Sequence, residues 1–305
     1  MMRWFETPSF DFVSTHRKAY IFSAILFVAS LAIILVKGLQ YGIDFRGGKE
    51  FVVNFSEPVE VTAVRDALVD PLGGAPEVKK FGADTDLMIR TDADGTINEV
   101  QGRLLDGLAD AFQGVETSVE KTYIVSPRFA EDLKIGALNS ILFAVSIIFL
   151  YILIRFRYWY YSLGAVVALI HDVVIVLGIF TLLTDVVPFS IQIDQAMIAA
   201  FLTIVGYSLN DTVVVFDRIR ENSKAYKQLA FPDMVNRSLN DTLSRTVITS
   251  ITTLFVVVIL FVFGGEVLKG FSFALIIGVI LGTYSSLFIG SAMIVELKAL
   301  RTKKD

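Results

Sequence analysis

Six long apolar segments constrain the fold of this chain more than any other feature. A helix rises about 1.5 Å per residue, so the roughly 30 Å hydrocarbon core of a bilayer requires about 20 apolar residues. Six segments meet this requirement: residues 19–37, 135–154, 160–183, 196–216, 246–263 and 271–295. Since 54% of the 305 residues are hydrophobic and 25 are Phe, we predict a polytopic α-helical membrane protein with six transmembrane helices.

The first segment is predicted to be an uncleaved anchor rather than a signal peptide. Its apolar run is longer than the about 7–15 residues of a signal-peptide core. The sequence that follows, Val36-Lys37-Gly38-Leu39, also offers no small-x-small cleavage site.

The orientation of the spans follows from Lys and Arg, which short loops retain on the cytoplasmic side. These residues gather in residues 1–18, at Arg155 and Arg157, in residues 217–245 and in residues 296–305. The opposite short loops hold almost none, since residues 184–195 have no basic side chain and the last connection has only Lys269. We therefore predict that both termini are cytoplasmic and that residues 184–195 form an extracytoplasmic loop.

Residues 38–132 are predicted to form one extracytoplasmic α+β domain. Between Gly38 and Glu131 there are 17 acidic and 9 basic residues, so this stretch carries −8 while the whole chain carries −4. Alternating strand patterns and two helical patterns follow one another in the order βαββαβ. This order predicts a ferredoxin-like sandwich, a fold that hosts many functions and identifies none.

Composition and motifs argue against several functional classes. The chain has no Cys and two His, which excludes a thiolate zinc site and an iron–sulfur cluster and disfavours any His-rich metal site. The acidic balance is unlike that of a nucleic-acid-binding protein. Without a Walker loop or a nucleophile–base motif, we expect no enzyme, no cofactor and no metal.

Two charged residues in or beside the spans, Asp211 and Arg245, are the strongest candidates for function, because ionisable groups at membrane depth are costly. Asp211 lies in the fourth span, one helical turn of apolar residues before the charges at Asp217 and Arg218. Arg245 stands at the cytoplasmic start of the fifth span. Because the two helices run antiparallel, both charges are expected at similar depth. They predict either a carboxylate that exchanges protons or a static buried ion pair.

The fifth span also carries a stripe of hydroxyl side chains at helical spacing, namely Thr246, Thr249, Ser250, Thr252 and Thr253. These can bind water or a neighbouring helix. Ser and Thr also pack transmembrane helices without any further role, so the stripe alone leaves both interpretations open.

Asp172 is the third candidate, near the middle of the third span. It follows Gly164 and Ala168 at four-residue spacing, which directs it toward protein rather than lipid. It is either a second relay carboxylate or a hydrogen-bonding group, and the adjacent His171 is expected to point about 100° away from it. Other small-residue rows, Gly136-Ser140-Ala144 and Gly278-Gly282-Ser286-Gly290, predict close helix packing.

Three sequence motifs resemble those of the bacterial SecD–SecF family, on its SecF side. They are Gly42-Ile43-Asp44-Phe45-Arg46-Gly47-Gly48 after the first span, the fourth-span motif Gly206-Tyr207-Ser208-Leu209-Asn210-Asp211-Thr212 with its continuation through Asn222, and Leu243-Ser244-Arg245-Thr246 with its continuation through Thr253. The resemblance spans nearly the whole chain.

This resemblance implies half of an RND-type twelve-helix unit, completed by SecD. It further implies an inner-membrane subunit beside the SecYEG channel, with YajC and SecA as indirect partners, that uses the proton motive force to help an unfolded polypeptide complete translocation. The coupling ion would be the proton. The family's proton-path Asp and Arg correspond to Asp211 and Arg245, and Asp172, Asn210, Thr249 and Thr253 become possible proton or water path residues.

Two other functions stay open. A passive membrane scaffold for the translocon would use the buried charges only for assembly. An RND-like small-molecule exporter would need a substrate-lined cavity in the extracytoplasmic domain, where no aromatic and polar cluster suggests one.

Overall fold

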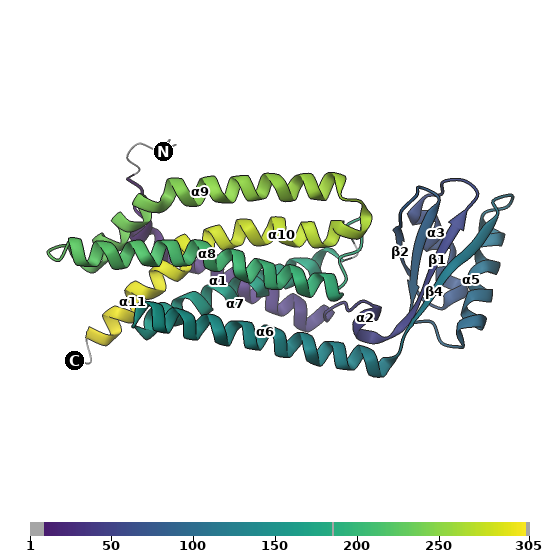
Figure 1. The fold of residues 1–305 in the computed structure, drawn as a ribbon, viewed down its shortest axis with the longest axis horizontal. Helices are drawn as coiled ribbons and strands as arrows, with labels where there is room; N and C mark the ends of the chain where they lie inside the picture. Colours follow the sequence, from purple (N-terminus) through teal and green to yellow (C-terminus); the bar gives the residue numbers. More distant parts are fainter. Residues whose placement is uncertain (1–8, 185, 303–305) are drawn as a thin grey trace.

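The computed structural model describes residues 9–184 and 186–302, with side chains through Leu300. Figure 1 shows an elongated molecule in which a helical bundle carries an α/β domain at one end. Both ends of the chain lie at the opposite end of the bundle. The outer parts of the predicted cytoplasmic ends, residues 1–8 and 303–305, lie outside the described residues, as does residue 185 of the predicted loop 184–195.

Within these described ranges, six helical segments are long and apolar enough to cross a membrane. They are α1 (Phe12–Lys37), α6 (Pro127–Phe156), α7 (Trp159–Leu183), α8 (Gln195–Ala225), α9 (Phe231–Phe263), and the continuous run of α10 (Glu266–Ser285), η1 (Ser286–Gly290) and α11 (Ser291–Thr302). The predicted fold class is therefore confirmed. The segment η1 is a single turn of π-helix, which interrupts the sixth span near its middle.

The helices extend beyond the predicted spans, and this corrects one boundary in particular. Residues 217–245, predicted as a loop, are mostly helical, because α8 runs to Ala225 and α9 begins at Phe231. The polar side chains of this stretch do not end the helices, because those of α8 pair with those of α9. Arg218 Nη2, for example, lies 2.8 Å from Asp241 Oδ2.

The α/β domain contains β1 (Gly48–Phe55), α3 (Val61–Ala67), α4 (Val69–Leu72), β2 (Glu77–Lys80), β3 (Asp86–Thr91), α5 (Ile97–Ala111) and β4 (Thr117–Val125). The strands form an antiparallel sheet in the order β2-β3-β1-β4, which is the predicted ferredoxin-like topology. The domain ends earlier than the predicted residue 132, because Ser126 caps α6 and Pro127 opens it.

One face of this sheet is covered by α3 and α5. Alternate residues of β1, among them Phe51, Val53 and Phe55, point into a core closed by Leu104 and Leu108 of α5, and all five side chains are fully buried. The helix α5 begins with a capping box between Thr96 and Glu99, which fixes its start. The domain thus has a hydrophobic core separate from that of the bundle.

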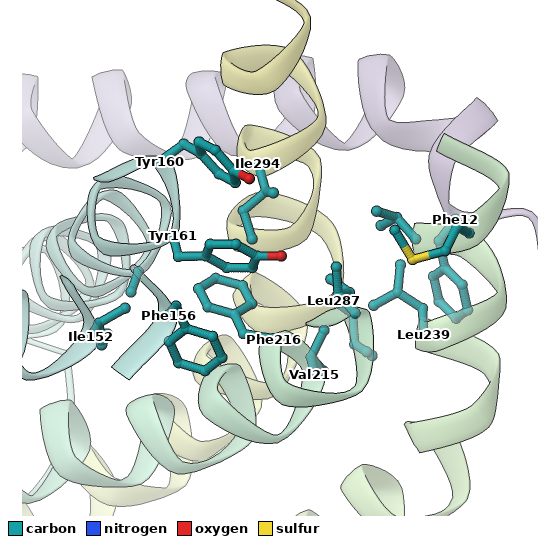
Figure 2. Close-up of a cluster of buried hydrophobic side chains, with 14 of the residues drawn as sticks. Phe12, Ile152, Phe156, Tyr160, Tyr161, Val215, Phe216, Leu239, Leu287 and Ile294 are labelled. Carbon is teal, nitrogen blue, oxygen red and sulfur yellow. The ribbon is translucent and has the colours of Figure 1, made fainter. Parts of the chain in front are cut away.

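The bundle is closed at the end far from the α/β domain by an aromatic cluster. Phe156, Tyr161 and Phe216 come from α6, α7 and α8, and their ring centroids lie 5.1–5.9 Å apart. Figure 2 shows these rings beside Ile294 and Leu287 of the last span. Aromatic packing of this kind contributes beyond simple burial, so the cluster holds four spans together at this end.

Close helix contact at the centre of the bundle depends on glycine. A Cβ added at Gly278 would lie 2.4 Å from the side chain of Ile204, and one at Gly282 would lie 2.9 Å from Ser208 Cβ. Both neighbours belong to α8. The small-residue row of α10 therefore packs against α8 as predicted, whereas Gly136 of α6 has nothing within 4 Å.

Candidate functional site

Asp211 lies on the face of α8 that meets α9 and α10, and only 3% of its surface is exposed. Ser250 Oγ of α9 donates to Asp211 Oδ2 over 3.4 Å, and the Thr249 hydroxyl also lies close to this carboxylate. Ser250 pairs in turn with Thr283 Oγ1 of α10 at 2.7 Å. Three helices therefore converge on one carboxylate through hydroxyl groups.

Arg245 is close enough to Asp211 to interact with it electrostatically. Among the described residues, however, no nitrogen of Arg245 lies within 4.0 Å of the Asp211 carboxylate. The Arg245 side chain is exposed on the outer surface of α9. The static buried ion pair considered from the sequence is therefore absent from this described region, and the two charges are neighbours without direct contact.

The other predicted path residues occupy three different environments. Asn210 is exposed on α8. Thr249 is half-buried and donates to the Arg245 carbonyl oxygen over 2.9 Å. Thr253 follows one helical turn later and is half-buried. Of these three, the structure brings Thr249 to Asp211.

Asp172 of α7 forms a second buried cluster, one helical turn along α8 from Asp211. It is fully buried and accepts hydrogen bonds from Ser208 Oγ at 2.8 Å and from Ser285 Oγ at 2.7 Å, and its Oδ1 atom is hydrogen-bonded to His171 Nδ1 at 2.9 Å. The expectation that His171 points away from Asp172 is therefore wrong. The Cβ atoms of successive helical positions point about 100° apart, but the imidazole of His171 is long enough to reach the carboxylate of Asp172.

The two carboxylate clusters share α8 and α10. Ser208 and Asp211 are one turn apart on α8, and Thr283 and Ser285 are two residues apart on α10. Ser286, the first residue of the π-helical turn, binds Thr212 Oγ1 of α8 at 3.0 Å. Any sliding of α10 along α8 must therefore rearrange the hydrogen bonds of both carboxylates together. A π-helical turn is a frequent feature of functional sites.

Sequence reasoning missed Ser208, Ser285 and Thr283 as site residues. Ser and Thr are common in transmembrane helices, so their type alone carries little information. A signal was present in the spacing, since Ser208 precedes Asp211 by three positions and Ser286 belongs to the small-residue row of α10.

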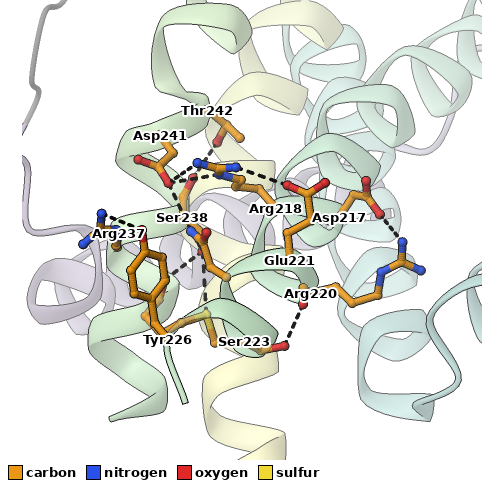
Figure 3. A network of polar contacts seen from close by, with 12 residues as sticks. Asp217, Arg218, Arg220, Glu221, Ser223, Tyr226, Arg237, Ser238, Asp241 and Thr242 are labelled. Atoms are coloured by element: carbon orange, nitrogen blue, oxygen red, sulfur yellow. Dashed lines mark hydrogen bonds and ion pairs between the residues drawn. The ribbon is translucent and has the colours of Figure 1, made fainter. Parts of the chain in front are cut away.

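A surface network next to the site braces the extended ends of α8 and α9. Arg218 lies between Glu221 and Asp241, at 3.1 and 2.8 Å. Asn222 Nδ2 donates to Ser238 Oγ over 2.9 Å, and Asp217 pairs with Arg220 at 2.8 Å. The pairs Arg218–Asp241 and Asn222–Ser238 join the two helices, and Figure 3 shows Arg218 of α8 reaching Asp241 of α9. The network holds α8 and α9 side by side just beyond the Asp211 cluster.

A polar stripe is exposed on the outer surface at membrane depth. Thr203, Gly206 and Asn210 follow one another along α8 at three- and four-residue spacing, and Arg245 and Thr252 lie on α9. All are exposed in the single chain. Polar groups are poorly accommodated by lipid, so this stripe requires water or another protein chain.

The chain was compared with known protein families. Residues 107–300 match the family described as "Protein export membrane protein SecD/SecF, C-terminal". Residues 32–59 match the "SecD/SecF GG Motif", which includes Gly47 and Gly48.

Similar full-length proteins carry one name. A "Protein translocase subunit SecF" from Rhodothermus marinus is 57% identical over 298 residues, covering 98% of this chain and 96% of that protein. Proteins of the same name from Calditerrivibrio nitroreducens and Escherichia coli O157:H7 are each 37% identical, over 96% and 94% of this chain and 95% and 88% of those proteins.

Two solved structures of SecDF share the fold. One, "a translocon-associated membrane protein" from Thermus thermophilus, is 34% identical with a TM-score of 0.80 over 97% of this chain. The other, in a super-membrane-facing form, is 33% identical with a TM-score of 0.76 over 99% of this chain. In both cases this chain spans 40% of the length of the solved chain.

Proposed function

Because the chain belongs to the SecF family of protein translocase subunits, we propose that it acts with SecD as a proton-driven auxiliary of the Sec export machinery. In this proposal the pair uses the proton motive force to promote late stages of translocation across the bacterial inner membrane. SecA supplies the ATP-driven steps at the SecYEG channel, with YajC as an accessory, and this subunit has no ATPase of its own.

The observation that carries the proposal is the environment of Asp211. At membrane depth, burial of an ionised carboxylate costs much free energy, whereas burial of the neutral carboxylic acid costs much less. Among the residues that the structure describes, only hydroxyl groups bind Asp211 directly, and the cation of Arg245 lies nearby without contact. Such a group can gain and lose a proton with little rearrangement, and each change alters the interaction of α8 with α9 and α10.

The energy available from the membrane fits this role. A potential of 100 mV supplies about 2.3 kcal/mol for each charge moved fully across the membrane. Shifting a two-state element from 1:99 to 99:1 requires about 5.5 kcal/mol. One proton at Asp211 would therefore bias the helices between two arrangements, and the remaining bias has to come from other interactions or from the pH gradient.

The exposed polar stripe supports SecD as the partner that completes the site. It places Arg245 and Asn210 on the surface of the single chain, where a second set of spans would cover them. In the proposed orientation both termini are cytoplasmic and the α/β domain is periplasmic. The basic residues at the end of the bundle far from that domain support this orientation.

The test compares Asp211→Asn with the wild type in membranes that contain SecD, SecYEG, SecA and ATP. Completion of translocation after SecA has acted is followed with and without a proton gradient. We expect the gradient-dependent part to be lost, while SecD still co-purifies with the variant. Asp233→Asn, which alters an exposed carboxylate at the start of α9, is the matched control and should behave like the wild type.

Persistence of gradient-dependent completion in Asp211→Asn would contradict the proton-coupling role and favour a passive scaffold. Loss of completion together with loss of SecD would point to assembly instead. Export of small molecules by the same membranes, abolished by Asp211→Asn, would favour the exporter.

A further inference from the structure

The α/β domain touches the bundle at a third place besides its two covalent connections. The covalent connections are residues 38–47, which lead from α1 into β1, and residues 125–127, which lead from β4 into α6. The third contact is made by residues 186–194, the segment that precedes α8. Ile193 N donates to Gln40 O over 2.8 Å, and Gly42 N donates to Ile193 O over 2.9 Å.

Asp194 connects this segment to α8, because its side chain caps the helix. Asp194 Oδ1 accepts from Met197 N over 2.8 Å, which satisfies one of the free N–H groups at the helix start. Asp211 lies 17 residues further along the same helix, or about 25 Å at 1.5 Å per residue. A rigid helix therefore joins the capped end to the candidate proton site.

The α/β domain presents a cluster of buried charges to this segment. Arg90 Nε of β3 donates to Glu50 Oε2 of β1 over 2.7 Å, and Lys79 Nζ lies 2.6 Å from Glu77 Oε1 within β2. Arg90 Nη1 lies 3.9 Å from Glu77 Oε2. The Glu77 side chain is only 6% exposed, so the paired charges compensate for much of the hydration that its carboxylate loses on burial.

Two contacts carry this cluster across to the bundle. Ser190 Oγ donates a short hydrogen bond to Glu77 Oε1, and Arg90 Nη1 lies 4.0 Å from Asp194 Oδ2. The Lys79 charge also acts on Asp194. We name these five residues, Glu77, Lys79, Arg90, Ser190 and Asp194, the junction clamp.

The ion pairs at the junction shift the pKa values of Glu77 and Arg90. Burial raises the pKa of Glu77, but Lys79, Ser190 and Arg90 together outweigh burial and leave that pKa below its usual value. Burial lowers the pKa of Arg90, and Glu77 and Glu50 more than compensate for it. Glu77 and Arg90 are therefore held in their charged forms by the partners that surround them.

The segment is also fixed from the bundle side. Gly270 near the start of α10 packs on the Ser190 carbonyl oxygen, and a Cβ at this position would lie 2.7 Å from it. Ser190 thus contacts β2 with its hydroxyl and α10 with its carbonyl oxygen. Because α8 follows the segment directly, the two helices shared by the carboxylate clusters, α8 and α10, both meet the α/β domain here.

A small polar cavity of about 40 Å³ lies beside the clamp, lined in part by Glu77, Arg90 and Gln192. The Glu77 Oε2 atom is buried without a hydrogen-bond partner among the described residues. A cavity of this size admits about one water molecule, and a buried carboxylate oxygen is a favourable site for it. The contacts of the clamp can therefore rearrange while a water molecule in this cavity hydrogen-bonds to Glu77 Oε2.

We propose that Glu77 and Arg90 are positioning residues which couple α8 and α10 to the α/β domain through the junction clamp, so that a helix displacement at the Asp211 site moves this domain. The inference rests on the proposed proton-coupled function. The two covalent connections leave from α1 and α6, not from α8 or α10. The clamp therefore joins the helices of the Asp211 site to the strands of the domain, whereas the backbone hydrogen bonds of Ile193 reach the first connection.

The test measures the distance between the α/β domain and the bundle in the complete complex with SecD. The chain has no native Cys, so spin labels can be placed at Asp110→Cys in α5 and Val267→Cys in α10, both exposed. In the clamp-intact chain, adding Asp211→Asn is expected to shift the distance distribution. With Glu77→Gln or Arg90→Gln, the distribution should broaden and lose the shift that Asp211→Asn causes.

Controls separate coupling from folding. Arg65→Gln alters a cation of α3 for which no ion pair is seen in the described structure, and it should leave the shift intact. Asp194→Asn removes the charge that the bundle contributes to the clamp. Because Asn still caps a helix well, this substitution should weaken the shift in the distance distribution without unfolding α8. Arg90→Lys, which keeps the charge but loses the planar fork, should restore part of the shift that Arg90→Gln removes.

The outcomes distinguish this inference from the proposed function. A shift of wild-type size in both Glu77→Gln and Arg90→Gln would overturn the clamp, whatever Asp211 does in export. An absent shift in the clamp-intact chain would contradict movement of the domain, and with it the clamp. Gradient-dependent completion that survives Asp211→Asn would contradict only the proton-coupling role.

Discussion

At the scale of single residues, the two buried carboxylates differ in how fully they are bound. Asp172 is hydrogen-bonded to three side chains and is fully buried, whereas Asp211 is held by longer hydroxyl contacts beside an exposed Arg245. Three hydrogen-bonded partners stabilise a fixed arrangement, and a loosely bound carboxylate suits one that changes. We infer that Asp172 organises the bundle, and its part in proton transfer stays a prediction from the sequence.

Asp172→Asn tests this difference. The amide group replaces one carboxylate oxygen with N–H donors and removes the charge, so the hydrogen bonds of Ser208, Ser285 and His171 have to rearrange in a buried site. An unsatisfied buried group costs about 1–3 kcal/mol, and we expect a lower Tm of the SecD complex in detergent. Asp211→Asn should change Tm much less. An unchanged Tm for Asp172→Asn, with loss of gradient-dependent export, would instead assign Asp172 to the proton path.

The sequence predicted the charged residues of the site better than its hydroxyl groups. Asp211 and Asp172 stand out because a charge in an apolar run has few structural explanations. Ser285 and Thr283 do not stand out, since small polar residues occur throughout such helices. The contact between His171 and Asp172 could not be predicted from helix rotation, because it depends on the length and rotamer of the imidazole.

At the scale of helices, the fit between α8 and α10 depends on glycine at the contact. Gly282→Ala would place a methyl group 2.9 Å from Ser208 Cβ, closer than carbon atoms approach in proteins, so α10 must move away from α8. We expect a lower Tm and weaker export, because Ser285 would leave Asp172 and Thr283 would leave Ser250. The measurements are thermal unfolding of the SecD complex and gradient-dependent translocation.

Gly136→Ala is the matched control for this prediction. Gly136 also lies in a small-residue row, but nothing lies within 4 Å of an added Cβ. Replacing Gly by Ala in a helix interior gains about 1 kcal/mol of helix propensity, so we expect an unchanged or slightly higher Tm. Equal destabilisation by both substitutions would mean that Gly282 is not a specific contact.

The spans could be predicted from the sequence because apolar length alone defines them. The helical extensions of α8 and α9 were missed because charged residues were interpreted as the end of a helix. A usable signal was present, since Val235, Leu239, Leu243 and Thr246 recur at helical spacing and all are buried. The π-helical turn at Ser286–Gly290 has no sequence pattern that would predict it.

At the scale of the whole molecule, the single chain is incomplete as a membrane protein. Lipid chains solvate apolar side chains but provide no hydrogen-bond partners for polar ones. An exposed row on α8 contains Thr203, Gly206 and Asn210. Gly206 has nothing within 4 Å of an added Cβ, which leaves room for another helix to approach closely. By contrast, α6 exposes apolar side chains such as Leu142, which is 68% exposed.

This asymmetry predicts which surface SecD covers. A photoactivated benzophenone attached at Thr203→Cys, in a chain without native Cys, should cross-link to SecD in native membranes, because lipid accommodates the polar row on α8 poorly and SecD is the proposed partner. The same label at Leu142→Cys should react with lipid, since that side chain has the character of a lipid contact. The products are identified by mass spectrometry. Cross-linking to SecD from Leu142→Cys alone would place SecD on α6, and the polar row with Asp211 behind it would then have to face water or another protein.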